Sequence, residues 1–262
     1  MYEDTKTDDD VYDQLVNEAL EASFEGWDFS FVRGRVVESE LPWDYRSIVE
    51  GHLAGADFAL DMGTGGGEFL AALSRLPAEM YATEQYEPNV AVARARLEPL
   101  GIQVLYIEEE TEPPFSRHLP LESGSIDVVI NRHESYTPTE VARVLRSSGV
   151  FVTQQVGSVD EITLMQFFEQ RSARIGNWNL ESAVLELEHA GMTVEYADEQ
   201  IGTTRFFDVG AVVYFLRAIP WLVEGFSVER YDEQLRRLHA RILARGYFET
   251  EMHRFVVAAR KE

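Results

Sequence analysis

The sequence predicts an α/β fold built on a doubly wound, mostly parallel sheet. Three observations carry this prediction: short apolar runs alternate with segments of helical spacing, glycines or prolines separate them, and no linker interrupts the series. Strands that alternate with helices form parallel sheets covered on both faces, because right-handed crossovers place the helices there. We therefore expect one elaborated domain over residues 1–262.

The first strand, turn and helix follow one another directly. Residues 58–60 are apolar and precede Asp61 and a run of glycines, which is typical of a buried strand that enters a turn. The apolar residues of 68–76 recur at helical spacing, so we expect a helix there. A second strand is expected at 80–85, and Pro88 opens the second helix.

Three more strands complete the predicted core, at 102–107, 126–130 and 150–156. Two helix starts beside them carry capping patterns. Thr137 and Glu140 frame a proline at the first helical position, and Ser158 and Glu161 form a second capping box.

The rest of the chain is expected to wrap this core. Residues 1–56 look mainly helical, and residues 192–262 mix strands with an amphipathic helix. Ligands of open parallel sheets bind beyond the carboxyl ends of the strands. The loops after residues 62, 84, 107, 130 and 156 should therefore converge on one site.

Composition narrows the function classes. Lys+Arg 23 against Asp+Glu 46 gives a net charge of −23, which disfavours nucleic acid because an acidic surface repels phosphates. The absence of cysteine excludes disulfides and fits a reducing compartment. The acidic N-terminus lacks a signal-peptide pattern, and no apolar run approaches about 18 residues. We expect a cytoplasmic protein without membrane contact.

The glycine-rich segment 61–67 is the clearest functional motif. Its glycines allow the backbone to approach a ligand closely. A dinucleotide fingerprint would need a glycine where Glu68 stands, so a nicotinamide oxidoreductase is the least favoured alternative, and no Walker lysine follows. Asp61 and the loop amides instead suit the ammonium and carboxylate of an amino-acid moiety.

Glu84 adds a second ligand group. It closes the second strand, 17 positions after Gly67, where an acidic side chain accepts hydrogen bonds from both ribose hydroxyls. An amino acid joined to a ribose points to S-adenosylmethionine as the cofactor.

Two motifs make the sequence resemble the class I S-adenosylmethionine-dependent methyltransferases of the broad type 11 group. These are the segment 60–67 and the Leu119-Pro120 pair that precedes Asp127 at the family's spacing. The resemblance implies a seven-stranded Rossmann-like sheet with a cofactor-binding core at 57–157. It also implies that the extension 1–56 forms a helical lid and that the half 158–262 carries a helical insertion at about 208–246.

The resemblance also implies site residues. The expected cofactor contacts come from the strand ends and their loops: Asp61, Gly63, Thr64, Gly65, Gly67, Glu84, Gln85, Glu109 and Asn131. Glu109 stands here for an acid after the third strand that would meet the adenine amino group, and Glu108 and Glu110 are alternatives. The expected substrate pocket combines aromatic and polar side chains: Trp27, Trp43, Tyr45, Arg132 and Gln154.

His133 is the candidate catalytic residue. With an ordinary pKa near 6.5 it can accept a proton from an oxygen nucleophile, whereas an amine acceptor needs only desolvation and alignment. The alternative is a structural role in the lead-in to the next helix. No histidine pair has zinc spacing, so we expect no metal.

Together these features predict an enzyme that methylates a small molecule. One alternative is an RNA base methyltransferase, which would need a basic stripe that the sequence lacks. The other is a protein that binds S-adenosylmethionine without turnover, because a fold alone does not guarantee chemistry. The sequence carries no signal for an oligomeric state.

Overall fold

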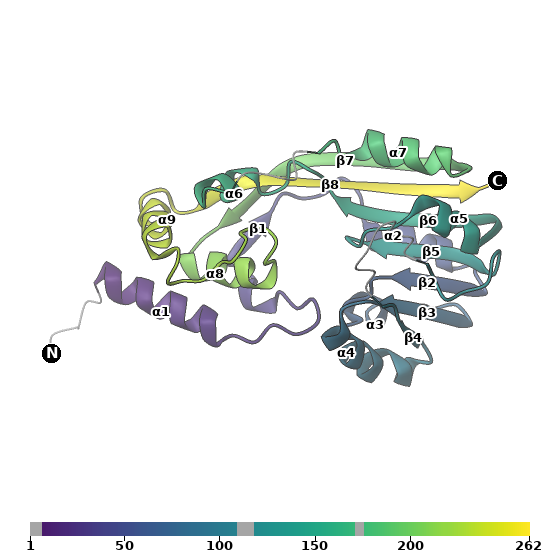
Figure 1. The fold of residues 1–262 in the computed structure, drawn as a ribbon, viewed down its shortest axis with the longest axis horizontal. Coiled ribbons are helices and arrows are strands. Elements are labelled where there is room, and N and C mark those ends of the chain that lie inside the picture. The colour runs from purple at the N-terminus through teal and green to yellow at the C-terminus, as the bar shows by residue number, and fades with distance from the viewer. Residues whose placement is uncertain (1–6, 109–117, 171–175) are drawn as a thin grey trace.

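A computed structural model describes residues 7–108, 118–170 and 176–262 of the chain. Within these ranges, eight strands form one sheet in the order β1-β7-β8-β6-β5-β2-β3-β4 (Figure 1). Its parallel part consists of five neighbouring strands: β2 (Phe58–Met62), β3 (Glu79–Glu84), β4 (Gln103–Tyr106), β5 (Ile126–Arg132) and β6 (Leu145–Val156).

Helices cover both faces of the parallel strands, which confirms the doubly wound prediction. One face packs against α2 (Tyr45–Leu53), α3 (Glu68–Ala71) and α4 (Glu87–Leu97). The other face packs against α5 (Pro138–Val144) and α7 (Leu180–His189). The apolar residues in the middle of these strands, such as Leu60, Val129 and Val152, are fully buried between the layers, as is typical of parallel sheets.

The antiparallel part of the sheet corrects the expected strand number from seven to eight. β8 (Phe248–Lys261) lies between β6 and β7 (Met192–Phe206), antiparallel to both. The additional strand is β1 (Val36–Glu38), which pairs with the far end of β7. The extension 1–56 is thus not only helical. A three-residue edge strand leaves no periodic pattern, and a distant partner stabilises it.

A second hydrophobic core lies at the far end of the long β7–β8 ribbon (Figure 1). It joins α1 (Asp8–Glu21), α6 (Ile162–Phe167), α8 (Val209–Ala218) and α9 (Asp232–Arg245). The last two helices lie within residues 208–246, where the resemblance implies a helical insertion. The carboxyl ends of the parallel strands point toward this helical layer. No helix in the described residues is long and apolar enough to cross a membrane.

α5 begins at Pro138 with Thr137 as its N-cap, as predicted, but the expected capping bonds need correction. Thr137 makes no side-chain capping bond, because Glu140 instead accepts from Leu119 N and binds Arg143. Glu161 is the N-cap of α6 in a left-handed conformation and also makes no side-chain cap. Contacts with distant residues therefore replaced the local capping boxes.

Candidate active site

The glycine loop joins β2 to α3, and its geometry explains its composition. Gly63, Gly65 and Gly67 have φ values of 70°, 63° and 80°, a region that residues with a Cβ atom rarely adopt. A Cβ atom at Gly63 would lie 2.4 Å from the Glu134 side chain, and one at Gly67 would lie 2.6 Å from Leu97. The loop is therefore packed closely on both sides.

Glu84 binds this loop from the end of the neighbouring strand. Its Oε2 accepts a hydrogen bond from Gly65 N at 2.7 Å, and its Oε1 accepts from the backbone N–H groups of Gln85 and Tyr86 at 2.9 and 2.8 Å. The side chain is buried, which raises the pKa of Glu84. A carboxylate has about four lone-pair sites, so one remains for a ligand hydroxyl. Gln85 contributes here through its backbone.

Asp61 lies near the end of β2, close enough to Glu84 to feel its charge. It is 4% exposed, and burial raises the pKa of Asp61 to about 7, with the Glu84 charge adding to the effect. The buried hydroxyl of Thr64 follows in the loop. A buried carboxyl near its pKa favours a ligand cation, because the cation would hold it in the ionised form.

Glu134 belongs to this acidic group, although the sequence analysis did not single it out. Its side chain lies over Gly63, and its charge raises the pKa of Glu84. It is also tied locally, since Oε1 accepts from Ser135 N at 3.0 Å. Only the fold brings Glu134 to Gly63, so no spacing in the sequence signals this contact.

Arg96 neutralises the charge of Glu68. Its guanidinium donates to Gly66 O and pairs with the Glu68 carboxylate. The charge of Glu68 is therefore neutralised, and it does not by itself exclude an anionic ligand. The pair fixes the glycine loop to α4.

A second group of site residues forms a hydrogen-bonded chain. The buried Gln154 accepts from Trp43 Nε1 at 2.8 Å and lies against His133 Nε2 at 3.1 Å. Burial and the charges of Arg254 and Arg132 lower the pKa of His133 well below its usual value. The structure thus brings three predicted residues together at the ends of β5 and β6.

Tyr45 and Asn131 lie next to this chain. The Tyr45 hydroxyl donates to Asn131 O at 2.9 Å. The Asn131 side chain is fully buried and accepts from Thr153 and Gln155 at 2.8 and 2.6 Å. Its carboxamide therefore connects β5 to β6.

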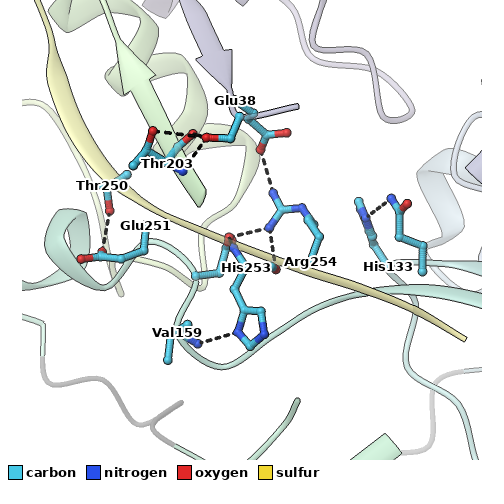
Figure 2. A network of polar contacts seen from close by, with 11 residues as sticks. Glu38, His133, Val159, Thr203, Thr250, Glu251, His253 and Arg254 are labelled. Atoms are coloured by element: carbon cyan, nitrogen blue, oxygen red, sulfur yellow. Dashed lines mark hydrogen bonds and ion pairs between the residues drawn. The ribbon is translucent and has the colours of Figure 1, made fainter. Parts of the chain in front are cut away.

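Arg254 is the centre of a polar network that the sequence analysis missed (Figure 2). It pairs with Asp160 at 2.5 Å and with Glu38 at 2.7 Å, which links β8 to the loop after β6 and to β1. Glu161 lies beside it, 1% exposed, and burial raises the pKa of Glu161 well above its usual value. Residues from three distant segments meet here, so no local motif exists.

The N-terminal extension reaches the glycine loop through a turn rather than a helix. A Cβ atom at Gly26 would lie 3.0 Å from the Cα of Gly66, and the Trp27 Cβ approaches Gly65. The Trp27 ring stacks on Trp221, which follows α8, with centroids 6.2 Å apart. Both rings are about half exposed. Trp221 is a further aromatic residue of this site that the sequence analysis did not name.

Two predicted residues remain. Arg132 is exposed at the end of β5, with its guanidinium 5.6 Å from the Phe69 ring centre. Glu109 and its alternative Glu110 lie outside the described residues, whereas Glu108 is described and exposed. Among the described residues, no group of three metal-ligating side chains occurs.

Comparison with known families identifies this arrangement. Residues 60–153, which contain the glycine loop, Glu84 and His133, match the methyltransferase domain family. The protein contains a methyltransferase domain. The matched segment begins within β2 and ends within β6, one residue before Gln154, and contains Asp61, Glu84 and Glu134. Among curated proteins, no significant match was found.

Solved structures share the fold of this chain. A Bacillus halodurans C-125 protein assigned as a methyltransferase is 18% identical with a TM-score of 0.57, covering 83% of this chain and 98% of its own. The YcgJ protein from Bacillus subtilis is 14% identical with a TM-score of 0.53 and the same two coverages, 83% and 98%. A geranyl diphosphate methyltransferase in complex with GPP and sinefungin is 14% identical, has a TM-score of 0.50, and covers 83% of this chain and 76% of its own.

Proposed function

We propose that this methyltransferase moves the methyl group of S-adenosylmethionine to a small molecule. The observation that carries the proposal is the pair of buried carboxyls, Asp61 and Glu84, on either side of the glycine loop. Asp61 would hold the ammonium group of the methionine moiety, and the remaining lone-pair site of Glu84 would accept from a ribose hydroxyl. The residues present therefore fit the cofactor that the family uses.

The bound cofactor would supply an activated methyl group, and the chain's own residues would supply alignment and desolvation. Trp43 and Gln154 are buried, and the extension covers the glycine loop at Gly66. An acceptor held between these groups would meet few water molecules. Holding the reactants in line in such a site accounts for a large share of a barrier reduction.

A small acceptor suits the site better than RNA. The net charge of −23 opposes phosphate binding, and Glu84 and Glu134 concentrate part of that negative charge beside the glycine loop. The geranyl diphosphate methyltransferase shows by its name that this fold accommodates a small acceptor.

Calorimetry and a product assay test the proposal. The wild-type protein should bind S-adenosylhomocysteine and S-adenosylmethionine but neither NADH nor ATP, and a folded Asp61→Ala variant should bind none of them. Incubation with S-adenosylmethionine and fractions of a small-molecule extract should release S-adenosylhomocysteine, whereas incubation with total RNA should not. Binding without product in any fraction would favour the non-catalytic alternative.

A further inference from the structure

The hydrogen bonds around Gln154 fix the direction of its amide. Trp43 Nε1 lies 2.8 Å from Gln154 Oε1, and an indole N–H is only a donor. The Gln154 oxygen must therefore face Trp43, and its NH₂ group must face the other way. The group on that side is His133 Nε2, at 3.1 Å.

This direction determines the state of the imidazole. A neutral imidazole has one nitrogen that donates and one that accepts. Because the Gln154 NH₂ group donates, His133 Nε2 must accept, and the proton must sit on Nδ1. We infer that Trp43 and Gln154 hold His133 as the neutral Nδ1–H imidazole, so that His133 donates a hydrogen bond to a ligand oxygen and does not act as the base.

The backbone supports this arrangement. His133 N donates to Gln154 O at 2.8 Å, so two hydrogen bonds join the same two residues. His133 holds a φ of 63°, which costs about 1–2 kcal/mol for a residue with a Cβ atom. Gln154 in turn is 3% exposed and lies in the middle of the sheet, between β5 and β8. Two hydrogen bonds therefore hold His133 against a central strand of the sheet.

Positive charges near the imidazole also favour its neutral form. The charges of Arg254 and Arg132 oppose a positive charge on His133. Arg254 itself is held by Asp160 and Glu38. His133 Nδ1 has no hydrogen-bond partner among the residues that the structure describes. Its proton is the one left for a ligand.

This inference rests on the proposed function where it concerns the methyl acceptor. Because the Nε2 lone pair already accepts a hydrogen bond, the methyl acceptor cannot depend on His133 to remove its proton. An amine that reacts as the free base, or an oxygen already ionised, meets this condition. The ligand oxygen that Nδ1–H binds is a carboxylate or carbonyl oxygen, supplied either by the methionine moiety or by the acceptor.

Nitrogen NMR of histidine-labelled protein tests the inference directly. Two-bond proton–nitrogen spectra at pH 7 should show His133 protonated at Nδ1 and bare at Nε2, and the signal should be assigned by its loss in His133→Asn. Trp43→Phe keeps the ring but removes the N–H, so the Gln154 amide can turn and His133 should become a mixture of tautomers. Gln154→Glu presents only acceptors, so the proton should move to Nε2. Trp27→Phe removes an indole that takes no part in the hydrogen bonds of Trp43, Gln154 and His133. It is the matched control and should leave the His133 signals unchanged.

Two results would overturn the inference: wild-type His133 protonated on Nε2 or on both nitrogens at pH 7, or an unchanged tautomer in folded Trp43→Phe and Gln154→Glu. Addition of S-adenosylhomocysteine then identifies the oxygen. A shift of the Nδ1–H signal assigns it to the methionine carboxylate, and an unshifted signal assigns it to the acceptor. Failure to bind S-adenosylhomocysteine would contradict the proposed function, whereas the tautomer result would stand without it.

Discussion

The Glu84 carboxylate accepts a hydrogen bond from the Gly65 backbone, with 2.7 Å between Oε2 and N. The end of β3 thereby fixes the loop that follows β2, before any ligand is bound. Two more backbone N–H groups donate to the same carboxylate. The residue that we propose to bind the ribose thus also organises the loop proposed to hold the methionine moiety, and separate measurements report on the two effects.

Glu84→Ala should weaken S-adenosylhomocysteine binding by about 1–3 kcal/mol, the usual scale for hydrogen bonds to a charged group. It should also lower the melting temperature, because three backbone donors lose their acceptor. Calorimetric titration and thermal unfolding measure the two effects. Glu87→Ala, at an exposed carboxylate on the first turn of α4, is the control and should change neither. A lower melting temperature with unchanged affinity would assign Glu84 to the fold alone.

Cofactor binding should depend on pH through Asp61. Its pKa of about 7 lies above the ordinary value, so the carboxyl is largely protonated below pH 7 and must lose its proton to pair with an ammonium group. The affinity for S-adenosylhomocysteine should therefore fall up to about tenfold per pH unit below 7, with proton release on binding at pH 6. Calorimetry in buffers of different ionisation enthalpy measures the release. Asp61→Asn should bind weakly at every pH, and a similar pH dependence in that variant would assign it to another group.

The sequence predicted the parallel strands and the glycine loop because their causes are local. Apolar runs bounded by Asp61 and glycines require only that neighbouring residues form a strand and a turn. Leu97 and Glu134 then explain why those positions exclude a Cβ atom, but both come from other segments. The motif was therefore visible, whereas its packing was not.

The features that the sequence did not predict depend on long-range pairs. Residues Val36–Glu38 form a strand because they pair with β7, about 170 residues away in the sequence. Glu38 also forms an ion pair with Arg254. The capping pattern at Glu161 was misleading because this residue lies buried beside Asp160 and Arg254 instead. A local pattern cannot indicate which distant charge will compete for a carboxylate.

The contact between the extension and the glycine loop should be sensitive to Gly26. A Cβ atom there would lie 2.7 Å from a Glu68 carboxylate oxygen and 3.0 Å from the Gly66 Cα, so Gly26→Ala should push the extension away and weaken S-adenosylhomocysteine binding. Gly34 also has positive φ but faces open space, so Gly34→Ala carries only the backbone cost of about 1 kcal/mol. Titration of both variants should show weaker binding only for Gly26→Ala. Equal affinities would mean that the contact does not support the loop.

Arg254→Met should destabilise the fold by about 3–5 kcal/mol, because it leaves buried carboxyls at Asp160 and Glu161 without their cation. Burial already raises the pKa of both carboxyls, so each costs most when ionised and least when protonated. The loss measured by urea unfolding should therefore be smaller at pH 5 than at pH 8. Arg260 lies on the same strand as Arg254 and makes a partly exposed ion pair with Glu195. Arg260→Met breaks this pair and should cost less than about 1 kcal/mol. Equal losses would indicate that the Arg254 network is not held by charge.

The pH dependence of turnover separates a donor from a base at His133. If His133 were a base of ordinary pKa, the rate would fall as the pH drops through 6.5. Any substitution of His133 would then lower turnover by roughly 10²–10⁴. The pKa of His133 is instead lowered well below that value, so the neutral imidazole persists from pH 6 to 8 and adds no titration there. Because an asparagine amide can place its N–H near the position of Nδ1, His133→Asn should keep most of the turnover that His133→Ala loses. Steady-state rates of both variants at saturating cofactor give the comparison. If both variants lost turnover alike and the wild-type rate followed an imidazole titration, His133 would be the base and Gln154 would have to release Nε2 during the reaction.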